Sequence, residues 1–184
     1  AKAISDYQAA KTAGTLDAFA PVSIKDVAAA LADNADNRAV IREMVGAGKI
    51  TGIAFTDTKP PTFAFDRSVL TGDLTSTTNQ SPAQILQKIT TKYTLAITNV
   101  TAADALTIKP PVANATLALY VVDTSDAVTT NITALQTLAK AKTLTNVTFT
   151  AATPKPALTI TAAQLKVNPE LLATIKGDYD LTIT

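Results

Sequence analysis

An eleven-residue phrase from the middle of the chain returns at residues 174–184, and this internal repeat constrains the fold more than any other feature. KITTKYTLAIT covers residues 88–98 and TIKGDYDLTIT covers residues 174–184, with Ile, Tyr, Leu, Ile and Thr at matching places. Such self-similarity is typical of chains that use one supersecondary unit more than once. The sequence therefore predicts two related folding modules.

The similarity extends upstream of the repeated phrase. VSIKD at residues 22–26 matches LYVVD at residues 119–123, and in both an apolar strand ends in Asp before an Ala-rich helical stretch. We divide the chain into an N-terminal helical segment (residues 1–21), a first module (22–98), a connecting segment (99–116) and a second module (117–184). Further matched pairs are Ile50 with Leu144, Ile53 with Val147, Phe55 with Phe149, Phe63 with Leu158 and Phe65 with Ile160.

Each module has the predicted order strand–helix–strand–strand–helix–strand, which places the chain in the α/β (α+β) class. In the second module Val128, Ile132, Leu135 and Leu138 recur on one face of a helix. A Pro-containing turn, TKPPT or TPKP, separates the two middle strands, and the later helix begins at Ser81-Pro82 or Asn168-Pro169. The order fits a ferredoxin-like split β-α-β unit and equally a solenoid-like array of strand–helix steps.

Two insertions make the first module longer than the second. ADNADN at residues 32–37 would rotate the apolar face of its first helix, so we expect a break there. Asp36 or Asn37 would then cap a new helix that runs through Met44 and Val45. The second insertion is a loop rich in Thr and Ser at residues 71–80.

Composition excludes several classes of function. The chain has neither Cys nor His, so it lacks disulfides, thiolate nucleophiles and the commonest general base. Its net charge is +1, with no basic stripe interleaved with aromatics, which argues against nucleic acid as a partner. No apolar run approaches the length that spans a membrane. We expect a protein that is not an enzyme and has no membrane span.

A few polar residues are candidates for binding. Asp57 and Asp66 flank the Pro turn of the first module, and a carboxylate pair can bind calcium or serve as general acid and base. Their counterparts are Ala151 and Thr161, so turn solubility is the favoured explanation. Other candidates also have simple structural explanations: Asp123 and Asp126 as helix caps, Tyr93 and Tyr179 as half-buried strand residues instead of a sugar-stacking platform, and Gly46 or Gly48 in VGAGKITG as a helix C-cap.

Asn-x-Thr triplets are a further candidate feature, because they are formal acceptors for N-linked glycans. In a Thr-rich chain with Asn in its turns they also arise without any such role. The triplets begin at Asn99, Asn114, Asn131 and Asn146, and a poorer Asn-x-Ser site at Asn79 precedes a Pro.

The phrases LTITAAQL, NITALQTLAKAKTLTNVTFT and IKGDYDLTIT resemble modules of large repetitive proteins that bacteria secrete to the cell surface, among them type I secreted adhesins and surface-layer-like proteins. The calcium-binding nonapeptides of that group do not occur here. The resemblance implies an extracellular structural or interaction module of an adhesin, surface layer or self-assembling filament. Its partners would be neighbouring copies or repeats of itself, and surface glycans. The alternative is a module that binds carbohydrate or another ligand through the loop at residues 71–80.

The second copy of the repeated phrase raises a question about strand edges. A repeat that ends on a strand leaves an edge of its sheet unpaired. The sequence predicts that either a further repeat or another subunit covers that edge.

Overall fold

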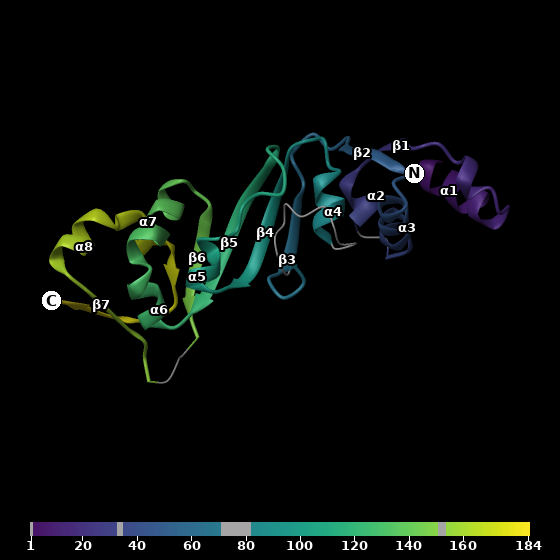
Figure 1. Cartoon of the computed structure of the whole chain (residues 1–184). Coiled ribbons are helices and arrows are strands. Elements are labelled where there is room, and N and C mark those ends of the chain that lie inside the picture. Colours follow the sequence, from purple (N-terminus) through teal and green to yellow (C-terminus); the bar gives the residue numbers. More distant parts are fainter. Residues whose placement is uncertain (1, 33–34, 71–81, 151–153) are drawn as a thin grey trace. The chain divides into compact units, whose positions relative to one another are not determined.

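A computed structural model describes residues 2–32, 35–70, 82–150 and 154–184 (Figure 1). The chain divides into two compact units. The first consists of residues 1–62, 72–94 and 110–115, and the second of residues 63–71, 95–109 and 116–184. The units do not coincide with the two sequence modules. The second unit includes residues 63–71 of the first module and residues 95–109, which span the end of that module and part of the connecting segment.

The first unit is built around two parallel strands, β1 (Val22–Asp26) and β2 (Ile50–Phe55). Between them the chain forms α2 (Ala28–Ala32) and α3 (Ala35–Gly46), and α4 (Pro82–Gln87) packs on α3. The N-terminal helix α1 (Lys2–Thr12) also packs on α3, and a short 3-10 helix, η1 (Leu16–Ala18), follows it. Ile4 and Tyr7 anchor α1 because both are almost fully buried.

The predicted break in the first helical stretch is confirmed, although its predicted cap is wrong. The chain forms α2 and α3 as separate helices, but α3 begins at Ala35, so Asp36 and Asn37 both lie inside its first turn. A carboxylate there still favours the helix through the helix dipole. The Asn37 side chain donates instead to the carbonyl of Ala30 in α2, at 2.8 Å. The predicted C-cap is found at Gly48, whose φ is +67°.

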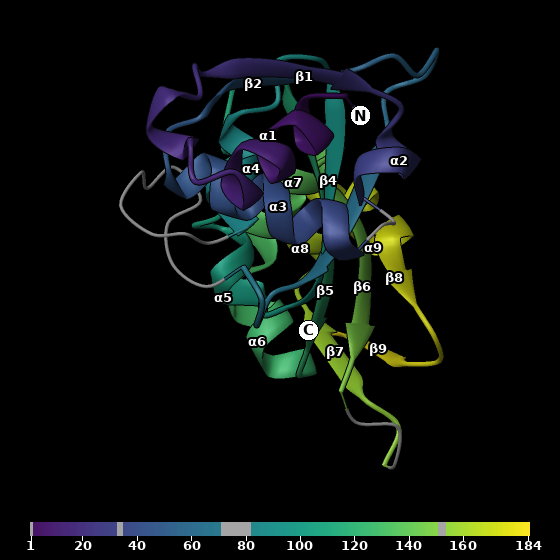
Figure 2. The same ribbon diagram turned by 90° about the vertical axis from the view of Figure 1, so that its right-hand side faces the viewer.

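The second unit contains a five-stranded sheet in the order β3-β4-β5-β6-β8. Figure 2 shows β5, β6 and β8 side by side. The first one or two residues of β3, β4 and β5 fall in the first unit. A two-stranded parallel sheet, β7-β9, forms separately. The strands are β3 (Thr62–Asp66), β4 (Tyr93–Val100), β5 (Ala115–Asp123), β6 (Leu144–Phe149), β7 (Ala157–Ile160), β8 (Ile175–Lys176) and β9 (Asp180–Ile183).

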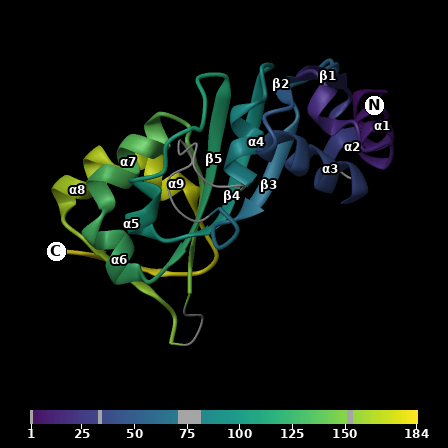
Figure 3. The ribbon, with the colours of Figure 1, turned by 45° about the vertical axis from the view of Figure 1, so that its right-hand side comes forward.

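The described helices of the second unit run from α5 to α9, and α5 and α6 lie beside each other in Figure 3. Leu135, Val147 and Leu171 are fully buried, and they come from α7, β6 and α9, so these elements share one core. None of the helices of the described residues is long and apolar enough to cross a membrane. The helices are α5 (Ala102–Ala105), α6 (Ser125–Thr130), α7 (Ile132–Lys140), α8 (Ala162–Val167) and α9 (Pro169–Thr174).

The second module breaks its first helix too, which the sequence did not predict. Val128 lies in α6, whereas Ile132 and Leu135 lie in α7, and the two helices meet at Asn131. Val128, Ile132 and Leu135 are nevertheless buried, and Leu138, the fourth predicted residue, is half-buried. Their spacing survives the break because Asn131 interrupts the helix without adding residues. The predicted helix start at Pro169 is confirmed, with Pro at the first helical position.

Corresponding strands of the two modules pair in the same register. Along β1 and β2 the register shifts once, between Val22 and Ser23. Along β5 and β6 it shifts between Leu119 and Tyr120, which are the matched positions. Both copies therefore build the same β-α-β unit, with a shift in register at the matched position.

The match continues at the later strands. Ile53 bridges to Ile89, and its counterpart Val147 pairs with Ile175. After each Pro turn the chain enters another sheet: β2 and β3 lie in different sheets, and so do β6 and β7. A ferredoxin-like unit would pair all four of its strands in a single sheet. The structure therefore supports the alternative, an array in which each module finishes one sheet and begins the next.

Candidate functional site

Asp57 and Asp66, the candidate calcium ligands, belong to different compact units, and each has a structural partner. In the first unit, Asp57 Oδ2 accepts a hydrogen bond from the backbone N–H of Ala28, at 2.8 Å. Ala28 is the first residue of α2, whose first N–H groups have no partner within the helix. Asp57 therefore stabilises the start of a helix.

Asp66 organises the turn that follows β3. Its Oδ1 accepts hydrogen bonds from the Ser68 hydroxyl, at 2.6 Å, and the Ser68 backbone N–H, at 2.9 Å. The Asn99 side chain donates to its other oxygen. These bonds, with the Ser68 hydroxyl first, hold the pKa of Asp66 below its usual value because they favour the ionised form. Among the residues that the structure describes, no cluster of three or more acidic side chains is placed to hold a metal ion.

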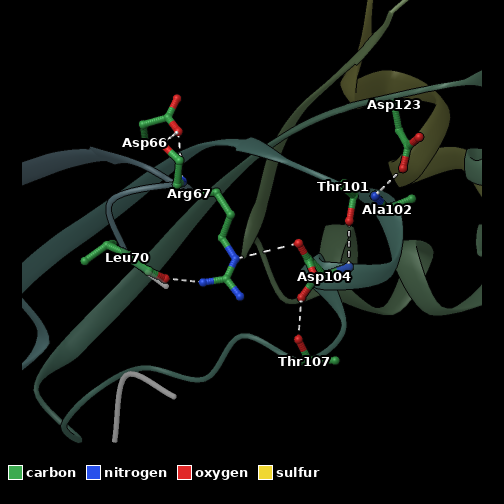
Figure 4. Close-up of polar contacts among 9 residues, drawn as sticks. Asp66, Arg67, Leu70, Thr101, Ala102, Asp104, Thr107 and Asp123 are labelled. Carbon is green, nitrogen blue, oxygen red and sulfur yellow. Dashed lines mark hydrogen bonds and ion pairs between the residues drawn. The ribbon is translucent and has the colours of Figure 1, made fainter. Parts of the chain in front are cut away.

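Arg67 ties this turn to α5 (Figure 4). Its guanidinium donates to the carbonyl of Leu70, and its Nε lies 3.7 Å from Asp104 Oδ2. Asp104 in turn donates its backbone N–H to Thr101, the N-cap of α5. The charged groups after β3 and β4 are thus connected into one network that fixes two turns.

Asp123, at the end of β5, also holds neighbouring backbone in place through hydrogen bonds. One of its oxygens accepts from the Thr124 N–H and the other from the Ala102 N–H, each at 2.8 Å (Figure 4 draws the second bond). The N-cap of α6 is Thr124, which accepts from the Ala127 N–H, so the predicted capping by Asp123 is one residue off. Asp126 lies in the first turn of α6, where its charge favours the helix dipole.

The two repeated tyrosines have different surroundings. Tyr93 is buried, its hydroxyl donates to the carbonyl of Leu86 at 3.2 Å, and burial raises its pKa. Tyr179 is half-buried and packs edge-on against Phe149, with ring centroids 5.7 Å apart. Because the ring of Tyr93 is covered, the two side chains do not form the paired sugar-stacking platform considered from the sequence.

The Asn-x-Thr asparagines with described side chains all make hydrogen bonds. Asn114 donates to backbone carbonyls of Ile89 and Thr91, and Asn131 donates to the carbonyl of Ala127. Asn146 accepts from Thr148, while Asn99 contacts Asp66. The loop at residues 71–80, with Asn79, lies outside the described residues, so the ligand-binding alternative stays a prediction.

The outer edge of β9 is the feature of the second unit that is best placed to contact another protein. Asp180 and Thr184 donate their N–H groups to Pro156 and Ile160 on the β7 side. Backbone groups of alternate residues face opposite edges of a strand, so those of Leu181 and Ile183 face away from β7. Of the described strands, only β7 pairs with β9.

The residues of the first module that match Leu181 and Ile183 are buried. Leu95 and Ile97 of β4 are 0% exposed, whereas their counterparts Leu181 and Ile183 are 41% and 50% exposed. The strand β4 has β3 on one side, as β9 has β7, but it also has β5 on the other side. Among the described strands, β9 therefore has one neighbour where its counterpart β4 has two, and the repeated phrase is the sequence signal that points to this difference.

A complementary edge lies on β1, in the first unit. Val22 donates its N–H to Lys49 beside β2, and Asp26 accepts from Thr56 on the same side. The backbone groups of Ser23 and Lys25 therefore face the opposite edge, and both residues are exposed. The matched strand β5 has β4 on that edge, while of the described strands only β2 pairs with β1.

Comparison of the chain with models of protein families, with curated proteins and with solved structures gave no match.

Proposed function

We propose that the chain is a structural, self-associating module of an extracellular bacterial surface protein, such as an adhesin, a surface layer or a filament. The observation that supports this most strongly is the junction between the two sequence modules. One continuous sheet takes β3 and β4 from the first module and β5, β6 and β8 from the second. Successive modules thus cohere by sharing a sheet.

Sheet sharing is a general way for one protein to bind another. Main-chain hydrogen bonds between strands supply affinity, and alternate side chains supply the register. The outer edge of β9 offers main-chain groups that no described strand pairs with, and Leu181 and Ile183 supply exposed side chains on the same strand. The polar side chains that we considered for catalysis or metal binding support the same interpretation, because Asp57, Asp66 and Asp123 are engaged by backbone N–H groups at helix starts and turns.

Sedimentation velocity over a wide range of protein concentrations tests the proposal. We expect the weight-average mass to rise with concentration, because association through an edge is reversible and follows mass action. Electron microscopy at the highest concentration should show assemblies. A chain that stays monomeric throughout would contradict the proposal.

A further inference from the structure

We propose that the outer edge of β9 pairs with the outer edge of β1 in a second copy of this chain, parallel and head to tail. This inference deepens the proposed self-association by naming the two surfaces, and it depends on that function. The same pairing already occurs inside the chain: β4, the counterpart of β9, pairs with β5, the counterpart of β1.

The number of strands at the two edges supports this partner. The largest sheet among the described residues has five strands, in the order β3-β4-β5-β6-β8. The sheet β7-β9 corresponds to its first two strands. The pair β1-β2, with the bridge from Ile53 to Ile89, corresponds to its last three, as the pairing of Val147 with Ile175 shows. The two partial sheets are complementary, and a second copy supplies the missing part.

The backbone groups at the two edges are complementary as well. Leu181 and Ile183 of β9 direct their N–H and C=O groups outward, and so do Ser23 and Lys25 of β1. In β4, Tyr93 donates its N–H to Asn114, just before β5, which fixes the register of that junction. Continued as a parallel ladder without a bulge, this register places Ile97 beside Leu119. The matched pair between two copies is Ile183 and Val22.

Pro21 limits the strength of this contact. It directly precedes Val22, so its backbone faces the outer edge of β1, where a proline has no N–H to donate. The matched residue of β5 is Ala118, which has one. Proline on an edge strand weakens pairing with other chains. The contact between copies is therefore weaker than the junction inside the chain.

Substitution of the exposed apolar residues tests the surface. The change Ile183→Lys places a charge on the edge and should weaken association about tenfold or more. Val167→Lys is the matched control: Val167 is 58% exposed, lies on α8 in the same unit, and should leave association unchanged. Sedimentation measures both, and circular dichroism confirms that each variant is folded.

Disulfide trapping tests the register, because the chain has no cysteine of its own. The Val22→Cys protein, mixed with a mass-tagged Ile183→Cys protein under mild oxidation, should form a mixed disulfide dimer. The Thr182→Cys protein is the control, because residue 182 points to the opposite face of the strand and should not crosslink to position 22.

Pro21→Ala should tighten association about two- to tenfold by restoring one donor. These experiments separate the inference from the proposed function. Association of the parent chain that Ile183→Lys leaves intact, without a selective disulfide to position 22, would overturn the inference and leave self-association standing. A parent chain that never associates would overturn both.

Discussion

Lys142 has a left-handed backbone, with φ of 57°, at the position where the first module has Gly48, with φ of 67°. Both residues end the helix before the second strand of their module, and both donate their N–H to the last turn. A residue with a Cβ is disfavoured in this conformation, so the same turn is more strained at Lys142 than at Gly48.

We expect Lys142→Gly to stabilise the protein by up to about 1 kcal/mol, because glycine adopts this conformation without strain. Lys140→Gly, at the end of α7, is the control and should destabilise by about 0.5–1 kcal/mol because it replaces a helical residue. Thermal unfolding measures the difference. Equal effects of the two substitutions would contradict this account of the turn.

The carboxyl group of Asp66 should titrate below its usual range, since its hydrogen bonds favour the charged form. Its contribution to stability is therefore present above the pKa of the unfolded chain and is lost as pH falls through the lower pKa of the folded state. Asn99→Gly removes one donor and keeps the left-handed backbone that Asn99 adopts, with φ of 54°.

NMR titration of the Asn99→Gly variant should show the pKa of Asp66 shifted upward. Asn146→Gly is the comparison, because Asn146 bonds to Thr148, and it should leave the pKa of Asp66 where it was. A pKa that is the same in all three proteins would refute the role given to Asn99.

At the scale of elements, a buried glutamine joins α7 to α9. Gln136 is buried, its Oε1 accepts from the Leu171 N–H at 2.8 Å, and its Nε2 donates to Glu170. Leu171 lies in the first turn of α9, where backbone N–H groups have no helical partner. One side chain thus starts one helix and docks it on another.

Gln136→Ala should destabilise the protein by about 1–3 kcal/mol, because the Leu171 N–H would be left buried without an acceptor. Thr137→Ala, on the exposed side of the same helix, should cost less than about 0.5 kcal/mol. Chemical denaturation followed by circular dichroism compares the two, and similar losses would mean that the bond to Leu171 contributes little.

Much of the element pattern could be predicted from the sequence because its signals are local. Pro at the start of a helix, as at Pro169, and Gly at its end, as at Gly48, act within one turn. The break at Asn131 gave no such signal, because the apolar spacing from Val128 to Leu135 continues across it. Which strands pair was also hidden, since parallel partners are far apart along the chain.

At the scale of the whole molecule, the candidate site shows most clearly where sequence reasoning stops. The phrases around Leu95 and Leu181 are alike, yet Leu95 is buried and Leu181 is exposed. The two strands also differ in their neighbours, because β5 pairs with β4, whereas no described strand takes that place beside β9. The repeated phrases do not distinguish the two strands, and only the structure shows which backbone groups the outer edge of β9 presents.

The character of that edge predicts how association responds to salt. The contact consists mainly of main-chain hydrogen bonds and the apolar residues of β9, with Lys25 as the charged residue on the β1 edge, and the chain has a net charge of only +1. Salt screens charge–charge attraction and leaves such contacts nearly unaffected. The association constant should change less than about threefold between roughly 0.05 and 0.5 M NaCl. A steep fall in sedimentation experiments would indicate that charges drive assembly.

The edges of β1 and β9 are different surfaces, and this gives any assembly built from them a direction. Identical surfaces meeting about a two-fold axis stop at a pair, but two unlike surfaces can add subunits indefinitely unless the geometry closes a ring. Such a polymer has two chemically distinct ends. An Ile183→Lys copy would still offer an intact β1, join one end and refuse the next subunit, so a small proportion of it would act as a terminator that sets polymer length.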